Sequence, residues 1–134
     1  MPSSTRPDAS LHRRSPWRSD GKRLVQGNAG TDGTEHRGWI VGHFVGSADV
    51  RTTKDAEIKW GIHSAGETRA DWSTDEYRTT VVLLVRGRFF VNFRDESVLL
   101  EHEGDYVMWG AGIDHSWRAE AESVVVTIRW PSLQ

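Results

Sequence analysis

The segment Gly104-Asp-Tyr-Val-Met-Trp-Gly-Ala-Gly-Ile-Asp-His-Ser-Trp-Arg-Ala119 decides the fold of this 134-residue chain. It predicts a strand over residues 105–109, a glycine-rich turn, and a second strand that begins at His115. Because successive residues of a strand alternate between its two faces, His115 and Trp117 point to the same side. The turn therefore fixes where the imidazole of His115 lies.

The rest of the chain from residue 38 onward consists of short β-prone runs that alternate with turn residues. These runs predict strands over Trp39–Val45, Glu57–His63, Tyr77–Arg86, Phe89–Phe93, Val98–Glu101 and Ser123–Trp130. Gly87 follows one run and precedes the next, so we expect a hairpin there with a positive φ at the glycine. Turn signals recur about every 8–12 residues, and no window has a helical period, which predicts an all-β sandwich or barrel.

Composition limits the classes of protein. A chain of 134 residues is long enough for one domain. The absence of cysteine excludes a disulfide framework and thiolate chemistry. No apolar run reaches the roughly 18 residues that cross a bilayer, and the first residues lack the apolar core of a secretory signal. We expect a cytoplasmic protein without a membrane segment.

The N-terminal segment differs from the remainder in composition and charge. Residues 1–37 carry seven basic and four acidic residues and no apolar periodicity, which predicts a largely disordered tail followed by one barrel domain over 38–134. The rest of the chain carries ten basic and fifteen acidic residues. An acidic body offers no stripe of cations for phosphates, so nucleic acid is not an expected partner.

The spacing of Gly104, Gly112 and His115 resembles the second sequence motif of the cupin superfamily, with Gly110 where proline is usual. The resemblance covers about residues 38–131 and is greatest to small bacterial single-domain cupins. It implies an all-β fold, a single-domain cupin jelly-roll barrel (double-stranded β-helix), with a ligand pocket inside the barrel near His115.

The first cupin motif is degenerate in this chain. Aligned from Gly66 and Gly87, it places Trp72, Thr74 and Thr80 where the family has two histidines and a glutamate. Three of the four metal ligands that the resemblance implies are therefore absent. A catalytic zinc or iron site needs about three protein ligands, so we expect no metal and no other cofactor.

Three residues are candidate catalytic groups. His115 titrates near physiological pH and suits proton transfer, although a structural histidine bonded to a backbone carbonyl is the alternative. His63 and Glu57 are its candidate counterparts. They share one face of the strand over 57–63 with Lys59, and that face lies either in solvent or in a polar cavity; for Glu57 and Lys59 the sequence favours solvent.

Five residues are candidate ligand contacts: Lys59, Trp72, Thr80, Trp117 and Arg129. The two tryptophans could form stacking walls, and Trp72 should point inward because it occupies a lost ligand position. Thr80 supplies a hydroxyl. Arg129 either binds a carboxylate or phosphate or pairs with a glutamate at the surface.

Three functions remain open at this point. The leading hypothesis is a metal-independent cupin that binds a polar small molecule and, as a lyase or isomerase, performs a dehydration, epimerisation or isomerisation. The second is a binding or sensing module without catalysis. The third is a metalloenzyme with His63, His115 and Glu57 as relocated ligands. We also expect a homodimer, because exposed strands of a small jelly roll tend to pair.

Overall fold

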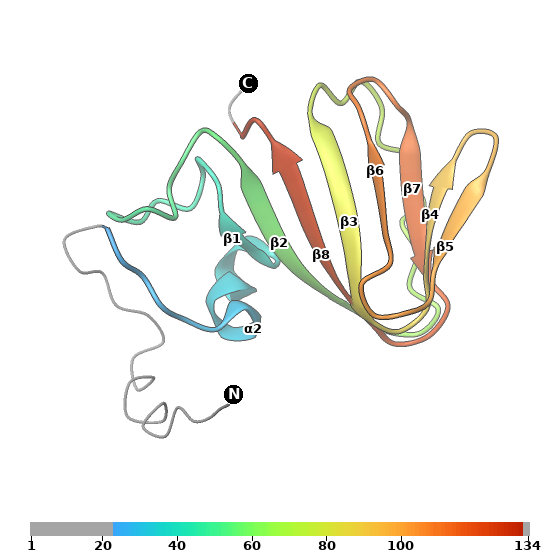
Figure 1. Cartoon of the computed structure of the whole chain (residues 1–134), viewed down its shortest axis with the longest axis horizontal. Helices are drawn as coiled ribbons and strands as arrows, with labels where there is room; N and C mark the ends of the chain where they lie inside the picture. Colours follow the sequence, from blue (N-terminus) through green and yellow to red (C-terminus); the bar gives the residue numbers. More distant parts are fainter. Residues whose placement is uncertain (1–22, 133–134) are drawn as a thin grey trace.

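A computed structural model describes residues 23–132 and builds them mainly from antiparallel strands (Figure 1). A five-stranded sheet has the order β1-β2-β8-β3-β6, and a three-stranded sheet has the order β5-β4-β7. The strands are β1 (Trp39–Val41), β2 (Glu57–His63), β3 (Thr79–Arg86), β4 (Phe89–Phe93), β5 (Ser97–Leu100), β6 (Tyr106–Trp109), β7 (His115–Ala119) and β8 (Ser123–Trp130). The two antiparallel sheets confirm the predicted all-β fold.

Strand bounds follow the sequence prediction closely except at β1. β2, β4 and β8 begin and end at the predicted residues, whereas β3 begins two residues later, β6 begins one residue later and β5 is shifted by one residue. β1 ends at Val41 instead of Val45, because the chain turns at Gly42, where a Cβ would lie 2.6 Å from the ring of Phe44. The alternation of residues 39–45 is therefore only partly strand.

The apolar core lies at the end of the barrel that the β3–β4 hairpin closes. Leu84 is fully buried and pairs with Val125 across β3 and β8. In the other sheet, Phe89 pairs with Leu100 on β5 and with Ala119 on β7, and all three are buried. Apolar side chains from both sheets thus pack against one another between the sheets.

Gly87 has the positive φ that the hairpin predicts, at 115°. A Cβ at this position would collide with Ser123 and with the backbone oxygen of Glu122. Only glycine therefore satisfies both the turn and the close approach of the β7–β8 connection.

Residues 29–36 form a short helical segment, although the sequence predicted a largely disordered tail over residues 1–37. It consists of α2 (Ala29–Asp32) and the 3₁₀ turn η1 (Gly33–His36), and the side chain of Asn28 caps its start by accepting from the backbone N–H of Thr31 at 3.2 Å. A cap and one turn carry no periodicity that a sequence reveals. The predicted disorder of residues 1–22 lies outside the described part of the chain.

Within residues 23–132, no helix has the length and apolar character needed to cross a bilayer. The cytoplasmic location stays a prediction.

Candidate functional site

A cavity of about 640 Å³ lies between the two sheets, and core residues such as Phe89, Val91 and Val125 form part of its wall. The five-stranded sheet supplies one wall, β4 and β7 supply the other, and a loop over residues 69–76 closes one side. Seven of the eight predicted site residues line it: Lys59, His63, Trp72, Thr80, His115, Trp117 and Arg129. Glu57 is the exception.

β2 turns its polar face inward. Glu57 and His63 are buried at 1% and 8% exposure, whereas Ile62 on the opposite face is 59% exposed. The interpretation that placed Glu57 and Lys59 in solvent is therefore wrong. Sequence alternation predicted which residues share a face, but the position of the second sheet decides which face is inside.

His115 begins β7, where its backbone pairs with Ser73 of the closing loop. Its Nδ1 lies 3.0 Å from the carbonyl oxygen of Ile113, and its ring lies 4.6 Å from that of Trp109. A carbonyl oxygen only accepts hydrogen bonds, so Nδ1 carries the proton and Nε2 keeps its lone pair. Burial lowers the pKa of His115 despite that hydrogen bond, so the neutral form dominates at neutral pH.

His63 lies at the other end of the cavity, with its ring 4.3 Å from that of Trp117 and 5.4 Å from that of Phe89. Its Nδ1 is 3.4 Å from a carboxylate oxygen of Glu67, an ion-pair distance without hydrogen-bond geometry. Burial lowers the pKa of His63 more than Glu67 raises it. The buried imidazole is thus neutral and has a carboxylate behind it.

The four metal positions that the cupin resemblance implies do come together. Trp72, Thr74, Thr80 and His115 all line the cavity. Of these, only His115 is a strong ligand for a transition metal, so the residues present do not fit the family's metal site. Trp72 faces the cavity as predicted, and the guanidinium carbon of Arg94 lies 4.1 Å from its ring centre.

Glu57 holds a buried ion-pair network at the edge of the cavity. One of its oxygens accepts from Arg78 at 2.7 Å and from Arg129 at 2.5 Å, and the other accepts from Ser132 at 2.9 Å. These three bonds occupy most of the acceptor positions of the carboxylate, and Glu57 is 1% exposed and does not line the cavity. Glu57 therefore does not lie where the sequence placed it as a catalytic group, and it positions Arg129.

The relocated metal site of the third hypothesis does not form. Among residues 23–132, no group of three histidine, cysteine, aspartate or glutamate side chains lies close enough to hold an ion. Both oxygens of Glu57 are bound elsewhere, and His63 and His115 come from different sheets.

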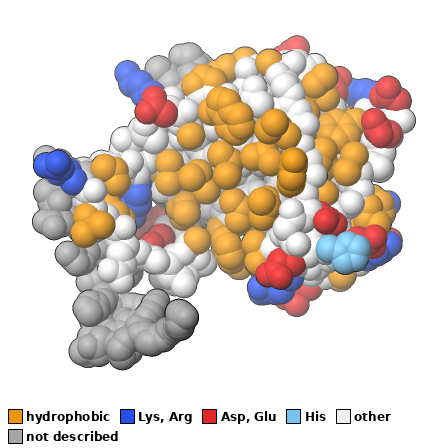
Figure 2. All heavy atoms as spheres, in the orientation of Figure 1, with side chains coloured by type: hydrophobic (Ala, Val, Ile, Leu, Met, Phe, Trp, Pro, Cys, Tyr) orange, Lys and Arg blue, Asp and Glu red, His pale blue; other side chains and the backbone are white. Residues whose placement is uncertain are grey.

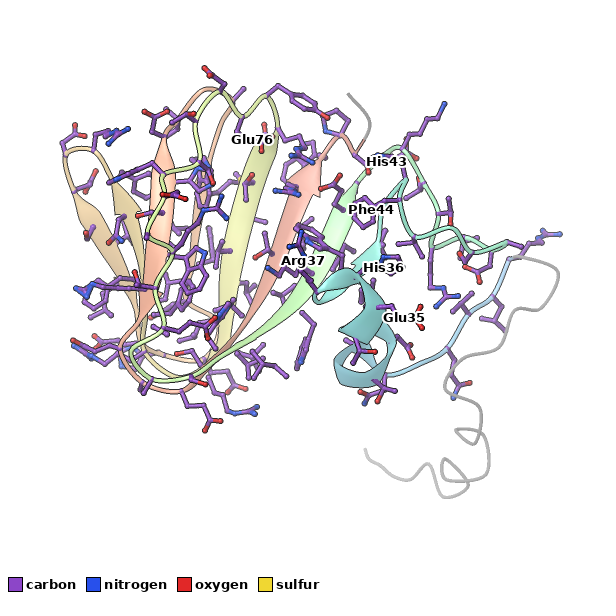
Figure 3. The ribbon with its side chains drawn as sticks, turned by 180° about the vertical axis from the view of Figure 1, so that it is seen from behind. Glu35, His36, Arg37, His43, Phe44 and Glu76 are labelled. Carbon is purple, nitrogen blue, oxygen red and sulfur yellow. The ribbon has the colours of Figure 1, made fainter. Side chains whose placement is uncertain are left out.

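The cavity wall also contains residues that were not predicted as site residues, among them Arg37, Trp39, Arg69 and Glu76. Figure 3 shows Arg37 where the helical segment meets β2, and Glu76 near the start of β3. The Glu76 carboxylate binds Arg78 through two hydrogen bonds of 2.5 and 2.8 Å. Burial would raise the pKa of Glu76, but Arg78 outweighs it and the pKa is lowered. Of these four residues, only Trp39 could have been suspected from the sequence, because it lies in an alternating run with Val41.

No protein-family model matches the sequence, and no curated protein is similar to it in sequence. Its structure is similar to those of several solved proteins. KdgF from Halomonas sp. matches with a TM-score of 0.53 and 22% identity over 59% of this chain and 72% of that one. A cupin superfamily protein from Desulfitobacterium hafniense DCB-2 has a TM-score of 0.53 and 17% identity over 61% and 71% of the two chains.

A putative ethanolamine utilization protein Q from Salmonella typhimurium LT2 has a TM-score of 0.54 and 13% identity, and the match covers 70% of this chain and 67% of that one. At these identities the similarity concerns the fold alone.

Proposed function

We propose that this chain, which has the fold of a small bacterial cupin, binds a polar small molecule in its barrel without a metal ion. In the cavity His115 removes a proton from the bound molecule, as a lyase or isomerase requires in a dehydration, epimerisation or isomerisation. The fold alone does not carry this proposal, because cupins share one architecture across many chemistries. The cavity residues carry it.

The observation that supports it most is the free Nε2 of His115. The ring is held by the carbonyl of Ile113 on one nitrogen and by Trp109 on its face, so the second nitrogen has a defined direction. His115 lines the cavity and is neutral because burial lowers its pKa. A fixed, unprotonated imidazole at a cavity wall is suited to act as a general base.

His63 is the counterpart that delivers a proton to the bound molecule after taking one from water, while His115 releases the abstracted proton to water. Its environment differs from that of His115, because a carboxylate and not a carbonyl lies behind its Nδ1, at 3.4 Å. The Glu67 carboxylate stabilises an imidazolium at His63 once a proton arrives. Two titratable groups with different neighbours divide the roles of base and acid.

A binding module without catalysis is the second candidate. Glu76 is the one carboxylate that lines the cavity among the described residues, and Arg78 neutralises it. Both histidines are neutral, so neither holds a proton ready to donate. A wall of this kind also suits ligand binding alone, and the experiment below separates the two.

The test is hydrogen exchange on a bound ligand. Polar metabolites are screened by thermal shift, since a ligand of the native state raises the melting temperature. The best binder is then followed by NMR in D₂O for exchange of its carbon-bound hydrogens. We expect exchange with the wild type, a rate lowered about 10²- to 10⁴-fold in His115→Gln, and an unchanged rate in His102→Gln, whose side chain is 79% exposed. Binding without exchange would support the binding module, and equal exchange in His115→Gln would refute the base.

We further propose that a second copy of the chain covers the outer face of the five-stranded sheet. Figure 2 shows apolar side chains gathered across the middle of the face that β2, β8, β3 and β6 form. Ile62, Leu83, Tyr106 and Met108 are exposed at 59%, 37%, 65% and 56%.

Four strands about 4.8 Å apart, each contributing five residues of about 3.3 Å, give roughly 300 Å² of projected sheet. A stable interface buries about 800 Å² per partner, with an apolar centre and a polar rim, so this face supplies the centre. Analytical ultracentrifugation should find a dimer for the wild type and a monomer for Met108→Glu. Val50→Glu should stay dimeric, because Val50 is equally exposed, at 55%, but lies in the loop before β2. A monomeric wild type would refute the dimer.

A further inference from the structure

The cavity wall carries more positive charge than its acids neutralise. Arg37, Lys59, Arg69 and Arg129 all line it. Arg129 is already paired with Glu57 at 2.5 Å. No acid of residues 23–132 lies within ion-pair distance of the other three, and Arg69 donates its Nε proton to the backbone oxygen of Asp71 instead.

Lys59 is at the centre of this group. It pairs directly with Trp39 across β1 and β2, and its Nζ lies 5.6 Å from the indole ring. The guanidinium carbon of Arg129 lies 4.2 Å from the same ring, so one tryptophan holds two cations beside the cavity. Burial lowers the pKa of Lys59, and the neighbouring Arg129, Arg37 and Arg69 lower it further, against a weaker opposite effect of Glu67.

Unpaired cations at close range repel one another, and a half-buried ammonium also loses hydration. Both costs are removed when an anion enters. The anion gains in return, because three cationic donors with rotatable side chains line the same cavity.

We propose that Lys59, Arg37 and Arg69 together bind the anionic group, a carboxylate or a phosphate, of the molecule that enters the barrel. This inference rests on the proposed function and adds the chemical class of the ligand. The sequence analysis predicted Arg129 as a possible anion anchor. Because Glu57 binds its guanidinium, Arg129 contributes only to the positive electrostatic potential at the site. His115 lies within electrostatic reach of Glu76, Arg69 and Arg129, so the imidazole and the cations act on the same bound molecule.

The experiment compares the melting temperatures of three proteins, the wild type, Lys59→Gln and Lys54→Gln, in inorganic phosphate and in chloride at equal ionic strength. Lys54 is exposed and does not line the cavity, so Lys54→Gln is the matched control. Phosphate stabilises most proteins by exclusion from their surface. The quantity to compare is therefore the difference between the variants in the rise of melting temperature from chloride to phosphate. We expect the phosphate-dependent rise to be larger in the wild type and in Lys54→Gln than in Lys59→Gln. In dilute chloride, Lys59→Gln should be at least as stable as the wild type, because the repulsion is relieved.

Benzoate and benzamide form a second pair of probes, since they differ in charge and hardly in shape. A rise with benzoate and none with benzamide supports a carboxylate ligand, and a Lys59-dependent rise with phosphate alone supports a phosphate. An equal rise with benzamide overturns the anion site but agrees with a polar ligand in the cavity. An equal phosphate response in Lys59→Gln and the wild type also overturns it, and the exchange test on His115 then decides the proposed function separately.

Discussion

Gly61 should be irreplaceable because of the histidine two residues further along β2. A Cβ on Gly61 would lie 2.9 Å from Nε2 of His63 and 3.4 Å from a methyl group of Val125. The first distance is too short for any carbon–nitrogen contact. The ring of His63 cannot swing aside, because it is 8% exposed and lies against Trp117 and Phe89. Gly61→Ala must therefore displace a packed side chain.

The expected cost is that of overpacking, about 1–3 kcal/mol of unfolding free energy. For a domain of this size that corresponds to a fall in melting temperature of roughly 5–15 °C. Urea unfolding followed by circular dichroism measures it. Gly110→Ala is the control, since a Cβ there would have no atom within 4 Å.

A double-mutant cycle tests the cause. If His63 is the obstacle, the cost of Gly61→Ala should fall below about 0.5 kcal/mol in a His63→Ala background. The reasoning is refuted if Gly61→Ala costs no more than Gly110→Ala, or if its cost is the same in both backgrounds.

Four further predictions concern stability. Glu57→Gln should lower the unfolding free energy by about 3 kcal/mol, because it leaves Arg78 and Arg129 without their buried partner; Glu120→Gln, at a half-exposed pair with Arg88, should scarcely change it in the same urea titration. Stability should fall as the pH drops below 6.5, because the folded pKa values of His63 and His115 lie under that value and the unfolded chain binds more protons there; the step should be absent in His63→Gln/His115→Gln. A second loss, as the pH falls from 3.8 to about 2, should be smaller in Asp49→Asn, because Asp49 accounts for only part of it and other carboxyls with a lowered pKa, such as Glu76, remain. Gly87→Ala should lower the melting temperature more than Gly104→Ala does, since both positions have positive φ but only the first would clash with Ser123.

Most of the strand positions could be predicted because they depend on local patterns. Alternation and turn residues determined β2, β4 and β8 to the residue, and the position of Gly87 predicted the hairpin. The helical segment over residues 29–36 could not be found, because a four-residue helix stabilised by one cap leaves no periodic signal.

The candidate site was predicted only in part, because some of its residues lie in local sequence motifs and others depend on partners that are distant in sequence. His115 and Trp72 lie at motif positions, so their direction into the cavity followed from the family pattern. Glu57 was chosen for its charge, but its role depends on Arg78 and Arg129, which come from other strands or loops. Its partners are distant in sequence, so no local pattern shows that its oxygens are occupied.

The sequence by itself determined which residues form strands, which of them share a face, and that the family's metal ligands are missing. Only the tertiary structure decided which face of β2 is inside, and that Arg37 and Arg69 reach the same cavity as Lys59. The physical reason is that alternation is a property of one strand, whereas burial and net charge at a point depend on every segment that folds around it.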